Sequence, residues 1–143
     1  MNAVVKKIQE TLNKTVGNFR TKIVMIYIDT TYGDSGIEPF LNIIGASVSS
    51  GKNFDEAVKL AEENDDIGFI YDVLNNCEES FDEINLSAFF PKWPDDLKKG
   101  ENEITDIIRH FISENDVFND VQKLYFHHVD SLDFVKIIDK PQF

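Results

Sequence analysis

The first half of the chain shows helix-like and strand-like spacing of its hydrophobic residues in turn. Residues 4–16 place apolar side chains three and four positions apart, as on one side of an amphipathic helix: Val4, Val5, Ile8, Leu12 and Val16. Residues 22–29 are almost continuously apolar and β-branched, which predicts a central strand covered on both faces. A turn-rich loop at 31–36 precedes a second strand at 40–48, which we expect to pair antiparallel with the first. Residues 55–63 predict a helix with four residues available for packing: Ala57, Val58, Leu60 and Ala61.

The pattern in residues 67–90 is mixed, and we interpret it as mostly helical. Apolar residues lie three or four positions apart over much of this stretch: Ile67, Ile70, Tyr71, Leu74, Phe81, Ile84 and Leu86. Pro91 and Pro94 must interrupt any helix that reaches them, because proline lacks the backbone N–H and clashes with the preceding turn.

The last third of the chain predicts a basic loop, a helix and two strands. The loop is expected at 98–100, and apolar residues at helical spacing follow it: Ile104, Ile107, Ile108, Phe111 and Ile112. Strands are predicted at 121–129, where apolar and polar residues partly alternate, and at 132–138. Taken together, the elements predict a single α+β domain over residues 1–143, in which helices pack against an antiparallel sheet of about four strands.

Composition narrows the class of protein. The chain has 143 residues, with 14 Lys and Arg against 26 Asp and Glu, and its net charge is −12. Because nucleic acids and anionic membranes select Lys and Arg, this balance argues against both as partners and favours a basic protein. The single cysteine, Cys77, cannot form an internal disulfide, and the sequence shows neither a long apolar stretch nor a leader pattern. We therefore expect a cytoplasmic protein.

Most of the negative charge lies in residues 55–96, which we call the acidic segment. This segment has thirteen acidic and two basic residues and carries −11 of the net charge. Aromatic residues lie between the acids, and protein interfaces use such rings as anchors inside a charged rim. Two interpretations follow: a docking face for a basic protein, or a solvated surface that only favours solubility.

The sequence shows no convincing catalytic or metal-binding motif. His127 and His128 are adjacent, but neighbouring side chains of a strand point to opposite faces, so the two would not share one metal ion. The sequence also has no glycine-rich phosphate-binding loop. We therefore expect a protein without enzymatic activity, cofactor or metal, and an enzyme with an unrecognised pocket is the less favoured alternative.

Four parts of the chain together support a resemblance to a known class: the helix at 4–16, the hydrophobic strand at 22–29, the acidic segment and the strand at 133–138. In this layout the chain resembles the immunity proteins of bacterial toxin systems, including those of contact-dependent growth inhibition. The resemblance implies a protein that binds and neutralises a cognate toxin domain, often a basic nuclease. The carboxylates would then take the place of the phosphates that a nuclease binds.

Under this hypothesis the acidic segment supplies the partner-binding surface. Its carboxylates would be Glu62, Glu63, Asp65, Asp66, Glu78, Glu79, Asp82 and Glu83, and its aromatic anchors would be Tyr71, Phe81 and Trp93. An acidic regulatory adaptor, or a nucleic-acid mimic that binds a host protein, would use the same face. The sequence leaves these alternatives open.

Overall fold

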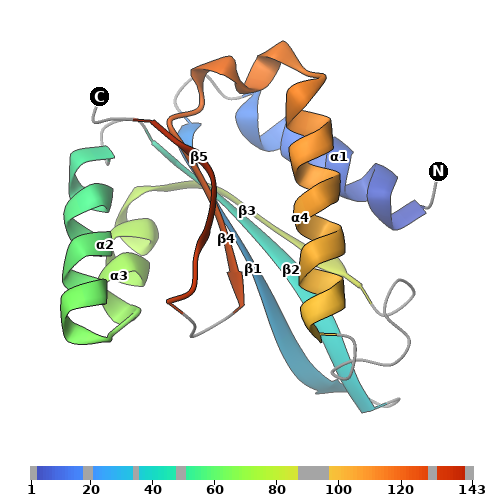
Figure 1. Ribbon diagram of the computed structural model, residues 1–143, viewed down its shortest axis with the longest axis horizontal. Coiled ribbons are helices and arrows are strands. Elements are labelled where there is room, and N and C mark those ends of the chain that lie inside the picture. The colour runs from blue at the N-terminus through green and yellow to red at the C-terminus, as the bar shows by residue number, and fades with distance from the viewer. Residues whose placement is uncertain are drawn as a thin grey trace.

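The sheet is organised around β1 (Thr21–Gly33), the apolar strand that the sequence predicted to be central. In the computed structural model the strands lie in the order β3-β2-β1-β4-β5, with β2 (Gly36–Ser47) and β4 (Lys123–His128) on either side of β1 (Figure 1). β3 (Glu78–Asn85) and β5 (Val135–Asp139) form the two edges. The structure describes residues 3–17, 21–33, 36–47, 51–86, 97–128 and 132–140.

Four α-helices and a short 3-10 helix accompany the sheet in the described ranges: α1 (Ala3–Val16), α2 (Gly51–Asn64), α3 (Gly68–Cys77), α4 (Leu97–Ser113) and η2 (Asp116–Asp120). The predicted class, a single α+β domain, is confirmed. However, within the described residues the sheet has five strands rather than about four, and it is mixed rather than antiparallel throughout. β1 pairs antiparallel with β2 but parallel with β4, so Ile26 lies beside both Ile43 and Phe126.

Residues 78–85 form a strand, so the helical interpretation of 67–90 is right for α3 and wrong for β3. β3 contributes few buried side chains. Ile84 packs beside Leu41 of β2, whereas Phe81 is exposed. With so little apolar surface of its own, this stretch takes its conformation from pairing with β2, a distant partner that local spacing does not reveal.

Two further local predictions are corrected. Residues 98–100 belong to the first turn of α4 rather than to a loop, and Gly100 is buried there. β4 is covered on both faces rather than half-buried, because five of its six residues are buried and only His128 is partly exposed. Its partial alternation of apolar and polar residues therefore does not mark a solvent-facing side.

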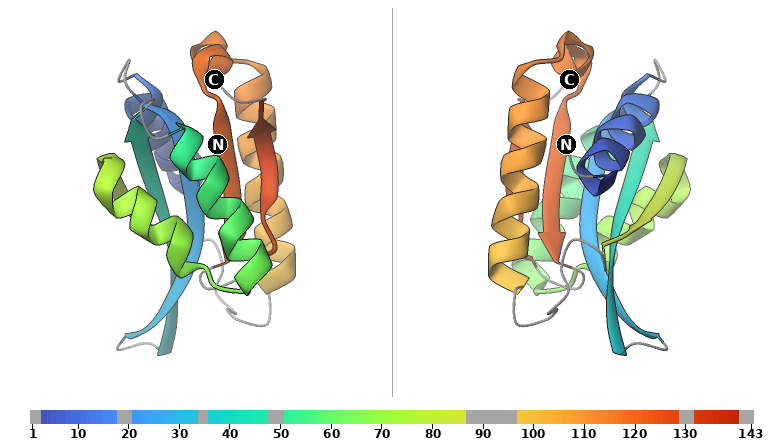
Figure 2. Two further views of the ribbon diagram at one scale, coloured as in Figure 1. Left: turned by 90° about the vertical axis from the view of Figure 1, so that its left-hand side faces the viewer. Right: turned by 90° about the vertical axis from the view of Figure 1, so that its right-hand side faces the viewer.

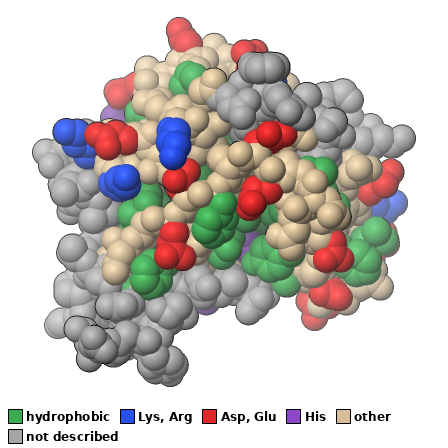
Figure 3. All heavy atoms as spheres, turned by 180° about the vertical axis from the view of Figure 1, so that it is seen from behind, with side chains coloured by type: hydrophobic (Ala, Val, Ile, Leu, Met, Phe, Trp, Pro, Cys, Tyr) green, Lys and Arg blue, Asp and Glu red, His purple; other side chains and the backbone are tan. Residues whose placement is uncertain are grey.

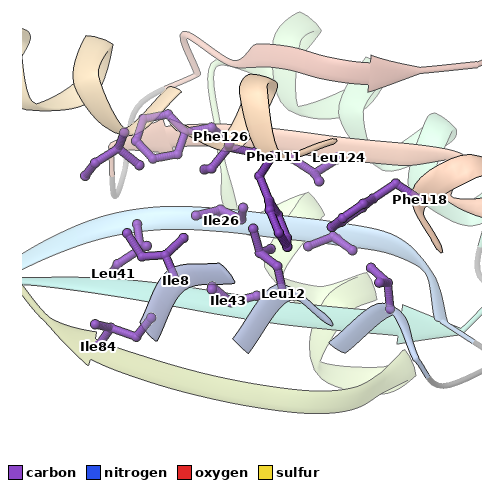
Figure 4. Packing of buried hydrophobic residues seen from close by; sticks show 14 of the residues in the cluster. Ile8, Leu12, Ile26, Leu41, Ile43, Ile84, Phe111, Phe118, Leu124 and Phe126 are labelled. Carbon is purple, nitrogen blue, oxygen red and sulfur yellow. The ribbon is translucent and has the colours of Figure 1, made fainter. Parts of the chain in front are cut away.

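Helices cover both faces of the sheet (Figure 2). α1 and α4 pack on one face, where Leu12 of α1 belongs to the larger core together with Ile26 and Phe126 (Figure 4). At the end of this core, Phe111 of α4 contacts Phe118 of η2 edge to face, with ring centroids 5.6 Å apart. This layer fixes one face of the sheet and leaves the opposite face to α2 and α3.

The opposite face of the sheet carries α2 and α3. Phe54 and Ala61 of α2 and Ile70 of α3 are fully buried in a second core with Met25 and Ile44 of the sheet. The two helices therefore each bury one side and present the other to solvent, as amphipathic helices do. Except for Asp55, the acids of α2 and α3 lie on this exposed layer.

Candidate partner-binding surface

The acidic segment includes two glutamates at the C-terminal end of α2. Glu62 and Glu63 are exposed in the last turn, which has no basic residue. Because a helix has partial negative charge at its C-terminus, each acid there is expected to destabilise it by about 0.3–1 kcal/mol. Leu60, which the sequence predicted to pack, is instead 42% exposed one turn before Glu63. The end of α2 therefore presents both acidic and apolar groups to solvent.

The turn between α2 and α3 uses its aspartates for local structure. Asp65 has a left-handed backbone with φ of 51°, which aspartate adopts more readily than most residues. The Gly68 backbone N–H donates a 2.9 Å hydrogen bond to Asp66 Oδ1 at the first turn of α3. Both aspartates are exposed, so they shape the turn and also add negative charge to its surface.

β3 places a second group of acids at the edge of the sheet. Its eight residues include four acids and no base. Phe81 is paired with Ile44 and shares the face that carries α2 and α3, yet it is 47% exposed. Glu83 lies two residues further along the same side and is also exposed. Figure 3 shows acidic and hydrophobic side chains interleaved on the face seen from behind.

Asp82, another predicted carboxylate of the docking face, points to the opposite side of the sheet. Its carboxylate lies 3.5 Å from the Lys14 ammonium of α1. Ile84, two residues on, packs in the core under α1 and α4, as the alternation of a strand requires. Asp82 therefore supports the contact between α1 and β3. At the start of the same strand, Glu78 is exposed and Glu79 is half-buried.

Tyr71, a predicted anchor, is half-buried against the sheet. Its ring centroid lies 6.0 Å from that of Tyr27 and 6.4 Å from that of His127. Phe134 joins this cluster, with its centroid 5.0 Å from that of His127. The ring of Tyr71 thus connects α3 to β1 and β4. Trp93, the third predicted anchor, lies outside the described residues.

The predicted carboxylates other than Asp82, together with Phe81, therefore lie in two patches. We call Glu62, Glu63, Asp65 and Asp66 the turn patch, and Glu78, Glu79, Phe81 and Glu83 the edge patch. α3 runs between the α2–α3 turn and the start of β3 (Figure 1). Its ten residues separate the two patches by about 15 Å along the helix axis.

A polar cluster centred on the buried Lys123 lies where β4 meets α2 and β5, and the sequence did not predict it. The Lys123 side chain is 7% exposed, and its ammonium lies 2.7 Å from Asp139 Oδ1 and 3.2 Å from Asp55 Oδ1. The Tyr125 hydroxyl donates a 2.8 Å hydrogen bond to the same Asp139 oxygen. A lysine inside a strongly apolar strand was the available signal, because a buried ammonium needs acidic partners.

Burial and mutual contact shift the pKa values of this cluster. Burial alone would lower the pKa of Lys123, but its hydrogen bonds to Asp139 and Asp55 outweigh burial and raise it. Burial would raise the pKa of Asp139, but the hydrogen bonds from Lys123 and Tyr125 outweigh it and lower the pKa. Burial, aided by the Asp139 carboxylate, raises the pKa of Tyr125 well above its usual range. The cluster fastens α2 and β5 to β4, which is a structural role.

The stability of the domain is expected to fall as pH rises above about 10, where tyrosine ionises in an unfolded chain. The folded protein keeps Tyr125 neutral to higher pH, so the unfolded state loses that proton first and gains stability. The raised pKa of Lys123 acts with the same sign. Urea denaturation should therefore show a shallower alkaline decline for Tyr125→Phe than for the unaltered protein, and identical slopes would contradict this account.

The adjacent histidines differ in burial, as neighbours on a strand can. His127 is 1% exposed, within the aromatic cluster around Tyr71, and His128 is partly exposed. Within the described ranges, no three His, Cys, Asp or Glu side chains gather as a metal site would require. None of the helices in that part of the chain is long and apolar enough to cross a membrane. Comparison with known proteins gives no match to a family model, a curated protein or a solved structure.

Proposed function

We propose that this chain is an immunity protein, a non-catalytic inhibitor that binds and neutralises a basic toxin domain such as a nuclease. The proposal is supported by the charge of the two patches. Residues 55–86 have eleven acidic residues and one basic residue. Ion pairs within the chain engage Asp55 and Asp82, whereas Glu62, Glu63, Glu78 and Glu83 are exposed to solvent.

The observation that carries the proposal is the sign of the charge at the end of α2. Charge of either sign would keep the protein soluble. Lysine at positions 62 and 63 would also stabilise the helix, whereas the glutamates present there destabilise it. A basic partner, in contrast, requires acids. The positions of Glu62 and Glu63 therefore favour binding over solubility as the reason for the acidic surface.

Inhibition would follow from occupation of the surface that a nuclease uses for nucleic acid. A cleft that attracts phosphates also attracts carboxylates, and complementary charge accelerates the encounter between two proteins. Exposed Phe81 and Leu60 each lie close in sequence to acids and would supply the apolar contacts that a stable interface needs. No chemistry by the inhibitor is required, because bound protein excludes the nucleic acid.

Co-expression with the product of the gene immediately upstream tests the proposed function. We expect the two proteins to purify together from the same cells and the chain to restore growth to cells that produce the toxin domain. A variant in which Glu62, Glu63, Glu78 and Glu83 are all lysine provides the control, because it should rescue growth poorly. Absence of both capture and rescue would contradict the proposal, and capture without rescue would favour a regulatory adaptor.

A further inference from the structure

We propose that the outer edge of β3 pairs with a basic, extended segment of the toxin domain, which adds a strand to the sheet. This inference rests on the proposed function and specifies how the partner is held. β3 is the terminal strand of the sheet in the part of the chain that the structure describes. Peptide segments add to such edges through backbone hydrogen bonds, while side chains supply the specificity.

The register of the sheet shows which backbone groups of β3 face outward. The Leu86 N–H donates a 2.8 Å hydrogen bond to the Pro39 carbonyl of β2. Because an antiparallel ladder alternates between hydrogen-bonded and non-hydrogen-bonded pairs, Ile84 and Asp82 also point their backbone groups toward β2. Phe81 and Glu83 therefore direct their N–H and C=O groups away from β2. They are the groups with which an added strand would pair.

Charge decides which segment can occupy this edge. Four acids in the eight residues of β3 would repel the same strand of a second copy, as edge strands commonly do to prevent self-association. A segment with lysine or arginine at alternate positions would place these side chains on one face of the new ladder, where they meet Glu83 on the side of Phe81, and opposite charges on paired strands attract. The occupant that fits is therefore a basic strand from the partner.

Phe81 gives the edge an apolar contact on one face. Its side chain is 47% exposed on the side that carries α2 and α3, and Glu83 lies beside it on that side. An added strand would place one side chain next to Phe81 and cover part of the ring. The opposite edge, β5, is shorter, and its Asp139 is engaged in the cluster around Lys123. β3 is thus the better suited edge.

Amide hydrogen exchange of the whole chain, measured by NMR, tests strand addition directly. The probe is an eight-residue peptide of alternating lysine and valine. We expect exchange at Phe81 and Glu83 to slow by about tenfold when the free peptide is at about nine times its Kd. The amides of Asp82 and Ile84, which face β2, should change little. A peptide with glutamate in place of lysine should have no effect.

Three outcomes of the exchange experiment would overturn the inference. One is unchanged exchange at Phe81 and Glu83 with the lysine peptide saturating. Another is equal slowing by a peptide whose alternate backbone nitrogens are methylated, since that peptide cannot form the ladder. The third is exchange that is already slow in the absence of peptide and slows further as the protein concentration rises, because a second copy of the chain would then occupy the edge.

A pair of variants separates this inference from the proposed function. Glu83→Pro removes both the carboxylate and the outward N–H, and an edge strand tolerates proline at such a position. Glu83→Gln removes the charge but keeps the N–H. We expect Glu83→Pro to bind the toxin domain about tenfold more weakly than Glu83→Gln, which corresponds to a loss of about 1.4 kcal/mol of binding free energy. Denaturation curves of both variants verify that each is folded.

The outcomes of the paired test are distinct. If the toxin domain is captured and neutralised but the two variants bind equally, the edge inference fails and the proposed function stands. If the unaltered chain neither captures the toxin domain nor restores growth, the proposed function itself fails. Weaker binding by Glu83→Pro alone supports the added strand.

Discussion

Replacing Phe126 with alanine is expected to destabilise the domain by about 3–5 kcal/mol, the range found for buried phenylalanine residues. Phe126 lies in β4, is 1% exposed and packs between the sheet and the helices α1 and α4 (Figure 4). The substitution deletes a ring that is packed in the core and leaves a cavity that the neighbouring strands cannot fill. Urea denaturation should show a lower midpoint with an unchanged slope.

Phe81→Ala is the matched control, because the same side chain is removed from an exposed position. Phe81 is 47% exposed, so its truncation is expected to lower stability by no more than about 1 kcal/mol. The same variant should nevertheless weaken binding to the toxin domain if Phe81 is an anchor. Equal losses of stability in Phe81→Ala and Phe126→Ala would show that the core is not where the structure places it.

Reversal of four exposed acids should slow association with the proposed toxin partner by about 10- to 1,000-fold at low ionic strength, the range of electrostatic steering. The set is Glu62→Lys, Glu63→Lys, Glu78→Lys and Glu83→Lys. These residues are exposed, and the set spares Asp66 and Asp82, which form contacts within the chain. Stopped-flow measurements at several salt concentrations should also show a weaker dependence of the association rate on salt.

The control for this experiment reverses four exposed acids outside the acidic segment: Glu10, Asp106, Asp116 and Asp120. Both sets change the net charge equally, so only the position of the charge differs. The control set should slow association far less. If both sets reduce the association rate equally, the effect is due to net charge in general, and the acidic segment is not part of the interface.

Charge reversal at the end of α2 also has an expected effect on stability. Because Glu62 and Glu63 lie at the negative end of the helix dipole, each replacement by lysine should stabilise the protein by about 0.3–1 kcal/mol. A variant with Glu62→Lys and Glu63→Lys should therefore unfold at a higher urea concentration while binding more weakly. Lower stability would contradict our explanation of why acids at this position favour a binding role.

The elements that were predicted from the sequence are those whose local pattern is strong. Residues 22–29 are apolar at nearly every position, and that pattern identified β1 as a strand covered on both faces. The helical stripe from Ile104 to Ile112 similarly identified most of α4. β3 was missed because its conformation depends on β2, and the parallel pairing of β1 with β4 has no local signal at all.

The sequence predicted which kinds of residue the candidate surface contains, but not the directions in which their side chains point. The count of acids identified the acidic segment, whereas the alternation of β3 turns Asp82 toward Lys14 and Phe81 toward the other face. Tyr71 is an aromatic residue of the kind that anchors protein interfaces, but α3 places its ring against Tyr27. Which side of an element a residue occupies depends on how that element packs, and a charge count does not contain this information.

The parallel pairing of β1 with β4 has a consequence for how the chain is made. Ile23 pairs with Lys123, so residues one hundred positions apart must meet before the centre of the sheet is complete. Contacts between such distant residues slow folding, and an uncovered apolar strand can associate with other chains meanwhile. During synthesis, one side of β1 stays open until β4 has left the ribosome. Under the proposed function, protection of a cell would therefore begin only after β4 has been synthesised and has docked, and a nascent chain lacking β4 would give none.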